Sequence, residues 1–248
     1  MKLTWLGHSC FLAEQDGYRI LLDPYKGVEG YPPLTETAVR AAAWEEHARW
    51  KAKGGYTVTL KTRMTVTRED GKNWEPRLQV HKILCSHDHF DHNAADQAEL
   101  VPFEGPCPFA VRTVETFHDD EGGALRGKNA VHILSAGGVT AAHLGDLGHR
   151  LSPEQIAAIG LLDALLVPVG GVYTVDAAGA RAACEALRPK CAVPMHYRHA
   201  PYGLPNVAGV EDFLALWPRE EVRRLEGPSL ELDGQARGVL VPRFCGED

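Results

Sequence analysis

The stretch SHDHFDHN, Ser86–Asn93, decides how this sequence is interpreted. Histidine and aspartate make up most of it, a composition poorly suited to a helix interior or a hydrophobic core. Residues two apart in an extended segment point the same way, so we expect His87 and His89 to bind one metal ion. Asp91 and His92 lie beyond a bend and are expected to bind a second. Imidazole and carboxylate without thiolate suit Zn²⁺, Mn²⁺ or Fe²⁺, and the alternative is a solvent-exposed, histidine-rich loop.

Several candidate ligands each follow a short apolar run that predicts a β-strand. In chain order they are Asp23 after RILL, His87 after KILCS, His118 after VRTVETF, Asp146 after TAAHLG and His196 after CAVPM. In open α/β sheets, ligands bind in the crevice outside the carboxyl ends of the strands. We therefore expect these side chains to converge at one edge of the fold.

The order of predicted elements indicates the fold class. Short strands cluster as hairpins near the N-terminus, with QDGY as a turn, whereas strands and helices alternate in the second half. Helices are predicted for residues 153–159, capped by Ser152, and for residues 176–187, and DALLVPV reads as a buried strand. We expect an α/β fold with a mixed sheet, built as one domain over residues 1–248.

Composition narrows the classes of partner. Lys plus Arg is 26 and Asp plus Glu is 33, and this net charge of −7 argues against nucleic acid as a partner. No apolar run reaches the roughly 18 residues of a membrane span, and the N-terminus MKLTWLGHSC does not resemble a signal peptide. The six cysteines have no C-x-x-C spacing, so we expect buried free thiols and a cytoplasmic location.

A set of further motifs accompanies the opening stretch. In order they are GHSCFLAE, LLDPY, ETFHDD, HLGDLGH, PVGG and VPMHY. Together with H-x-H-x-D-H, this set resembles the metallo-β-lactamase superfamily, in the branch that contains the ascorbate-6-phosphate lactonase and related uncharacterised metal-dependent hydrolases. The resemblance covers about residues 1–25 and 85–197. It implies a four-layer αββα sandwich, with two sheets face to face and helices outside.

The resemblance also implies a dinuclear metal site. One ion would have three histidine ligands, the other an aspartate and two histidines, and one aspartate would bridge them. The residues are His87, His89 and His118; Asp91, His92 and His196; and Asp146. Zinc is the metal implied first, with manganese and iron as alternatives. Asp23 would orient a ligand histidine, although a turn before Pro24 is an equally good interpretation.

The chemistry implied is hydrolysis. Two divalent ions activate a shared water for attack, with Asp91 steering the nucleophile and passing a proton to the leaving group. Asp146 joins Asp91 as a catalytic residue because it would bridge the ions. We expect a small anionic substrate, such as a lactone, an ester or an amide. A metal-dependent phosphodiesterase and a di-iron redox protein are the alternatives.

Residues near the ligand loops are candidates for binding this substrate. Arg126, Arg198 and His199 are expected to hold an anionic group, and Tyr173 to line the wall. His8, in GHS, either leans into the site or serves only its turn.

The remaining histidines have simpler interpretations. His47 and His81 are predicted at the surface, whereas His132 and His143 lie on predicted strands and are expected to be structural.

An inserted segment departs from the family pattern. Residues 26–79 stand between the DP motif and H-x-H-x-D-H, where relatives have a short connection. A helix is predicted for residues 37–53, and TVTLKTRMTV predicts a strand with EDGKN as its turn. Its apolar residues, among them Val58, Leu60 and Met64, need a partner surface. We expect a homo-oligomer in which residues 30–78 contribute to the interface or cover the active site.

Overall fold

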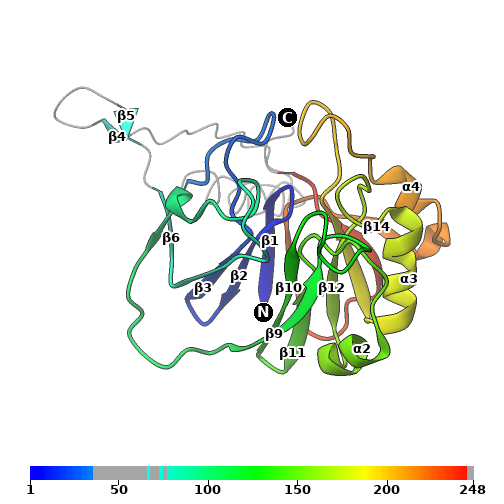
Figure 1. Ribbon diagram of the computed structural model, residues 1–248. Helices are drawn as coiled ribbons and strands as arrows, with labels where there is room; N and C mark the ends of the chain where they lie inside the picture. The colour runs from blue at the N-terminus through cyan, green and yellow to red at the C-terminus, as the bar shows by residue number, and fades with distance from the viewer. Residues whose placement is uncertain (36–65, 68–72, 75–76, 245–248) are drawn as a thin grey trace, which may run out of the picture.

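Two β-sheets packed face to face form the core of the protein (Figure 1). The computed structural model describes residues 1–35, 66–67, 73–74 and 77–244. The smaller sheet has the strand order β15-β1-β2-β3-β7. Its strands are β1 (Lys2–Gly7), β2 (Cys10–Gln15), β3 (Tyr18–Leu22), β7 (Lys82–Leu84) and β15 (Ser229–Glu231). Strands β15, β1, β2 and β3 are antiparallel, and β7 runs parallel to β3.

The larger sheet has the strand order β14-β16-β13-β12-β11-β10-β9. Its strands are β9 (Ala110–Phe117), β10 (Lys128–Ala136), β11 (Val139–His143), β12 (Ala164–Pro168), β13 (Cys191–Met195), β14 (Val222–Arg224) and β16 (Gly238–Val241). Strands β9, β10 and β11 are antiparallel, and the remaining neighbours are parallel. Every residue of β12 and β13 is buried, as expected for parallel strands covered on both faces.

The described helices lie on the far side of the larger sheet (Figure 1). They are α2 (Pro153–Ile159), α3 (Ala177–Leu187) and α4 (Glu211–Leu214), followed by the short 3₁₀ turn η2 (Arg219–Glu221). A second 3₁₀ turn, η1 (Ala95–Gln97), lies on the side of the smaller sheet. Ser152 and Gln155 form a capping box at the start of α2, and Asp176 caps α3. None of the described helices is long and apolar enough to cross a membrane.

One apolar cluster joins the facing sides of the sheets to the helices. It includes Leu3 and Phe11 of the smaller sheet, Ile133 of the larger sheet, Ala180 of α3 and Phe213 of α4. This arrangement is the layered α/β sandwich implied by the sequence.

A second apolar cluster covers the outer face of the smaller sheet. Leu12 and Leu21 of that sheet pack there against Tyr25, Val28 and Leu34 of the segment that follows β3, and against residues of β6 and β8. Strands β6 (Leu78–Val80) and β8 (Ala98–Leu100) are parallel partners.

The inserted segment leaves and rejoins the fold at one point. Thr35 and Arg77 form an antiparallel bridge, and the Leu78 N–H donates to the Leu34 carbonyl at 3.3 Å. Further out, β4 (Val66–Thr67) pairs with β5 (Asn73–Trp74), which fits the hairpin predicted around EDGKN. The predicted helix at residues 37–53 and Val58, Leu60 and Met64 lie outside the described residues.

Candidate metal centre

All the predicted ligands gather at the carboxyl ends of strands. Asp23 follows β3, residues 87–92 follow β7, His118 follows β9, Asp146 follows β11 and His196 follows β13. Strands from both sheets therefore deliver side chains to a shared edge, as the topology of such sheets favours.

Three histidines form what we call the open group: His87, His89 and His118. One ligand atom of each lies within 4.8 Å of the others. The ring centroids of His87 are 4.6 Å from those of both His89 and His118. His118 is buried, whereas His89 is exposed, so solvent reaches this group.

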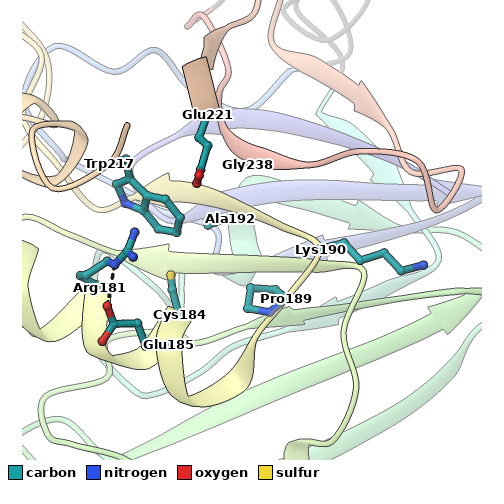
Figure 2. Close-up of a pocket in the computed structure, with 9 residues that line it drawn as sticks. All are labelled: Arg181, Cys184, Glu185, Pro189, Lys190, Ala192, Trp217, Glu221 and Gly238. Carbon is teal, nitrogen blue, oxygen red and sulfur yellow. Dashed lines mark hydrogen bonds and ion pairs between the residues drawn. The ribbon is translucent and has the colours of Figure 1, made fainter. Parts of the chain in front are cut away.

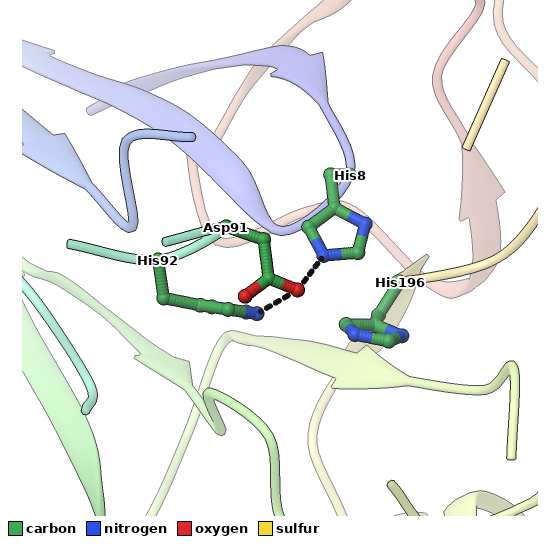
Figure 3. A group of neighbouring side chains, drawn as sticks. All are labelled: His8, Asp91, His92 and His196. Atoms are coloured by element: carbon green, nitrogen blue, oxygen red, sulfur yellow. Dashed lines mark hydrogen bonds and ion pairs between the residues drawn. The ribbon is translucent and has the colours of Figure 1, made fainter. Parts of the chain in front are cut away.

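A second cluster, the buried group, contains Asp91, His92 and His196 (Figure 3). His8 joins it, and one ligand atom from each of the four residues lies within 4.8 Å of the others. All four are buried. The His8 Nε2 is 3.3 Å from the Asp91 Oδ2, so the structure brings His8, whose role the sequence leaves open, against a predicted ligand.

Asp146 lies between the two groups. Its Oδ2 is 3.2 Å from the Nε2 of His118 and 3.2 Å from the Nε2 of His196, and its Oδ1 is 3.2 Å from the Nε2 of His92. The Asp146 N–H donates to the Asn129 Oδ1 at 2.9 Å, which holds the backbone in place. One carboxylate thus contacts histidines of both groups.

Asp23 contacts the buried group through His92. Its Oδ1 accepts the Ser86 N–H at 2.7 Å, and its Oδ2 accepts the Ser86 hydroxyl at 2.6 Å and lies 2.8 Å from the His92 Nδ1. This contact turns the His92 Nε2 toward the centre. Burial favours the neutral acid, but the nearby His143 and His92 and the hydrogen bond from Ser86 hold the pKa of Asp23 well below its usual range.

The charges in the centre suit a cation. Burial opposes ionisation of Asp146 and Asp91, but the surrounding histidines hold the pKa of both carboxyls below the usual range. Burial lowers the pKa of His87 to about 3 and that of His8 to about 4, so both rings are neutral near pH 7. Burial opposes the charged form of His92 too, yet Asp146 and Asp23 raise its pKa well above the usual value.

Several polar atoms of the centre are buried and form no hydrogen bond of good geometry, even where Asp146 lies 3.2 Å from a histidine nitrogen. They are the Nε2 of His87 and His92, the Nδ1 of His118, the Oδ1 of Asp146 and both ring nitrogens of His196. Leaving such an atom unsatisfied costs about 1–3 kcal/mol, more if it is charged. Coordination of divalent cations would satisfy the Nε2 of His87, His92 and His196 and the Oδ1 of Asp146, and these nitrogen and oxygen donors suit zinc, manganese or iron. The residues present therefore fit a metal centre.

Two of the predicted substrate-binding residues are neighbours. The Arg126 guanidinium donates to the Val172 carbonyl at 3.1 Å and lies 5.9 Å from the centre of the Tyr173 ring. The Tyr173 hydroxyl accepts a hydrogen bond from the Asn206 amide at 2.7 Å. Arg126 stands in the loop that follows His118 and is exposed.

The other two lie after β13. The Arg198 guanidinium donates to the Pro205 carbonyl at 3.2 Å. The His199 ring packs among aromatic rings, 5.3 Å from Trp5 and 5.4 Å from Phe244. Burial lowers the pKa of His199 to about 4, so this ring carries no charge for an anion near neutral pH.

Other polar residues of the centre escaped the sequence interpretation. Ser86 immediately precedes the opening ligands, and this position is the only available signal for it. Asn129 lies on β10, and its side chain accepts the Asp146 N–H and donates to the Leu144 carbonyl. Nothing in the sequence pattern indicates this role.

The remaining histidines have local partners. His132 and His143 are buried, with Nε2 atoms 3.1 Å from the Cys85 carbonyl and 2.8 Å from the Ser9 carbonyl. His81 was predicted at the surface but is half-buried, because its Nδ1 accepts the Arg19 N–H and its ring packs 4.9 Å from that of Tyr18. His47 lies outside the described residues.

A separate cavity of about 240 Å³ lies near the amino ends of β13 and β16 (Figure 2). The Arg181 guanidinium stacks 3.9 Å from the Trp217 ring there and donates to Glu185 at 2.9 Å. None of the predicted ligands or substrate-binding residues lines this cavity, so it is distinct from the metal centre.

Comparison with known proteins gives a consistent result. Residues 2–196 match the beta-lactamase superfamily domain, a match that ends at the last predicted ligand. A metal-dependent hydrolase of Carboxydothermus hydrogenoformans is 29% identical over 86% of this chain and 91% of its own length. One from Archaeoglobus fulgidus is 28% identical over 81% and 85%. The crystal structure of a candidate zinc-dependent hydrolase of the metallo-beta-lactamase superfamily from Thermotoga maritima is 29% identical, with a TM-score of 0.64 and 97% of each chain covered.

Proposed function

The chain belongs to the beta-lactamase superfamily and is a metal-dependent hydrolase, and from this premise we propose that it works with two divalent ions on a small substrate. The observation that carries the proposal is Asp146, whose Oδ2 is 3.2 Å from a histidine of each group. Two ligand groups joined by one carboxylate can hold two ions side by side, as a dinuclear site does. Zinc is the first candidate metal, with manganese and iron as alternatives.

Asp146 and Asp91 have separate roles in the proposed reaction. Two bound ions supply Lewis-acid polarisation and lower the pKa of a water toward neutrality. Asp146 holds the two groups together. Asp91 is buried and ionised, so its carboxylate can orient the attacking water, accept a proton from it and pass that proton to the leaving group.

We further propose that the substrate is a small anionic lactone, ester or amide. Support comes from Arg126 and Tyr173, which stand together in loops beside the ligand strands. The exposed guanidinium has donors beyond the one that bonds the Val172 carbonyl, and the planar fork suits a carboxylate or phosphate. The contacts of Arg198 and His199 with Pro205 and the aromatic rings give less support to these two residues.

Elemental analysis and a substrate panel test the proposal together. The purified protein, reconstituted with Zn²⁺ or Mn²⁺, should contain about two ions per chain and hydrolyse a member of a panel of lactones, esters and amides. Fewer than one ion per chain after reconstitution would contradict the dinuclear centre. Turnover confined to phosphodiesters would replace the proposed substrate class, and turnover that requires oxygen and iron would favour a redox protein.

We also propose that the chain forms a homo-oligomer through residues 30–78. The apolar pattern of this segment supports the proposal, and most of the segment lies outside the described residues. Light scattering on the intact protein, and on a version with a short Gly–Ser linker in its place, should give an oligomer and a smaller species. A monomeric intact protein would contradict it.

A further inference from the structure

His8 enters the buried group from the turn that joins β1 to β2. The predicted ligands of that group instead follow β7 and β13. Its side chain is buried, and its ring centroid is 4.2 Å from that of His196 and 5.2 Å from that of His92. Its Nε2 points at the Asp91 Oδ2 from 3.3 Å (Figure 3).

The turn that carries His8 is fixed by its own contacts. The His8 carbonyl accepts the Trp5 indole N–H at 3.0 Å and the His196 N–H at 3.2 Å. A side chain at Gly7, whose φ is 110°, would collide with the Tyr31 ring. These contacts tie the β1–β2 turn to the end of β13, so the ring of His8 has a set direction.

The backbone of His8 is strained, with a φ of 51°. In the described residues, positive φ at residues other than glycine also occurs at Asp23 and His196, which lie in the centre, and at Asp16, Val172 and Arg188, which do not. Strained conformations persist where surrounding structure imposes them, and they concentrate at functional sites. His8 shares this feature with Asp23, which contacts His92, and with the predicted ligand His196.

We propose that His8 is a positioning residue, which donates a hydrogen bond from Nε2 to the Asp91 Oδ2 and fixes the direction of that carboxylate. The inference rests on the proposed function. It gives Asp91 the kind of support that Asp23 gives His92. A ligand role for His8 is disfavoured because Asp91, His92, His196 and Asp146 already offer four protein ligands, and a catalytic site keeps a position open.

Three variants separate hydrogen bonding from ring shape and from backbone strain. His8→Gln keeps an N–H donor that can reach Asp91, and His8→Phe keeps a ring without a donor. His8→Asn tolerates the left-handed backbone, but its side chain is too short to reach, so it serves if the phenylalanine variant does not fold. His81→Phe is the matched control, since His81 is half-buried and lies against Tyr18.

The readouts are metal stoichiometry, metal affinity by competition with a chelator, the absorption spectrum of the Co²⁺ form, and turnover. We expect His8→Phe and His8→Asn to retain two ions at saturating metal, with an unchanged Co²⁺ spectrum, but to lose about 10–100-fold in affinity for one ion or in turnover. His8→Gln should recover most of this loss, and His81→Phe should match the parent protein.

Two results would overturn the proposal while leaving the proposed function intact. Loss of one ion in all three His8 variants, or an altered Co²⁺ spectrum, would make His8 a ligand. Parental affinity and turnover in His8→Phe would leave it a turn residue only. A parent protein that binds fewer than one ion would instead contradict the proposed function, and the positioning role with it.

Discussion

The open group and the buried group use similar side chains in different surroundings. His87, His89 and His118 reach solvent through the exposed His89. Asp91 and His92 are buried, as is His196. The same histidine chemistry is therefore presented once at a surface and once in an interior from which water is largely excluded.

The two groups also differ in how they are supported. His92 is held by Asp23 and Asp91 is contacted by His8, both through buried atoms. In the open group, His87 has the Ser86 hydroxyl 2.9 Å from its Nδ1. Electrostatic attraction is stronger where water is excluded, and oriented ligands bind metal more tightly. We therefore expect the buried group to hold its ion more firmly and the open group to face the substrate.

The largest effect is expected from replacing Asp146, the one carboxylate that contacts histidines of both groups. Asp146→Ala takes away the carboxylate that both share, so metal content should fall to one ion or fewer. Losing a Lewis-acid contribution of several kcal/mol corresponds to a drop in turnover of ~10³-fold. Elemental analysis and steady-state kinetics measure both quantities. A variant with two ions and near-parental activity would show that the groups bind independently.

The next prediction separates the groups. His118→Ala should lose the ion of the open group, and His196→Ala that of the buried group, so each variant should retain about one ion per chain. Because the buried ion is expected to bind more tightly, the ion left in His118→Ala should resist a chelator longer than the ion left in His196→Ala. Competition with a chelator followed by elemental analysis provides the measurement, with His81→Ala as the control that keeps both ions. If the remaining ion resisted the chelator equally in both variants, the buried group would not bind its ion more tightly than the open group.

Asp23→Asn tests the support of the buried group alone. Asparagine tolerates the positive φ of 45° at this position, so the backbone should persist. The amide no longer presents two anionic oxygens to Ser86 and His92, and affinity for the buried ion should fall about 10–100-fold. Titration of the metal-free protein with Zn²⁺ should show one weakened site beside one unchanged site. Equal weakening of both sites would mean that Asp23 supports the whole centre.

The smallest effect is expected at Arg126, a candidate substrate-binding residue in the loop after His118. Arg126→Gln removes an exposed charge that contacts Val172 and Tyr173, so KM for an anionic substrate should rise by up to about tenfold with little change in kcat. Arg112→Gln is the matched control, because Arg112 also donates to a carbonyl, that of Ala158, but lies beside α2. A fall in kcat with unchanged KM would place Arg126 in the reaction instead of the binding step.

Residues at strand ends could be predicted from the sequence because a local pattern determines their place. His118 follows β9 and Asp146 follows β11, and these two strands end at a common edge because both are antiparallel to β10 between them. Asn129 reaches the centre only through the register between β10 and its neighbours, which no short pattern encodes. His8 likewise contacts Asp91 across 83 positions of sequence, through a turn fixed by Trp5. The roles of Asn129 and His8 could not be predicted because they depend on tertiary contacts between residues far apart in the sequence.

The bridge between Thr35 and Arg77 has a consequence for how this enzyme can change over generations. The inserted segment begins and ends at this bridge, which lies in the sequence between Asp23 after β3 and the ligands after β7. Because each doubling of loop length costs only about 0.6 kcal/mol in closure entropy, the number of residues between Thr35 and Arg77 can change at little cost in stability. Asp23 is joined to the strand that carries His87 by its hydrogen bonds with Ser86, so we expect the position of these two residues to be independent of the length of the inserted segment. New specificities can thus be acquired there by insertion, without altering the ligands.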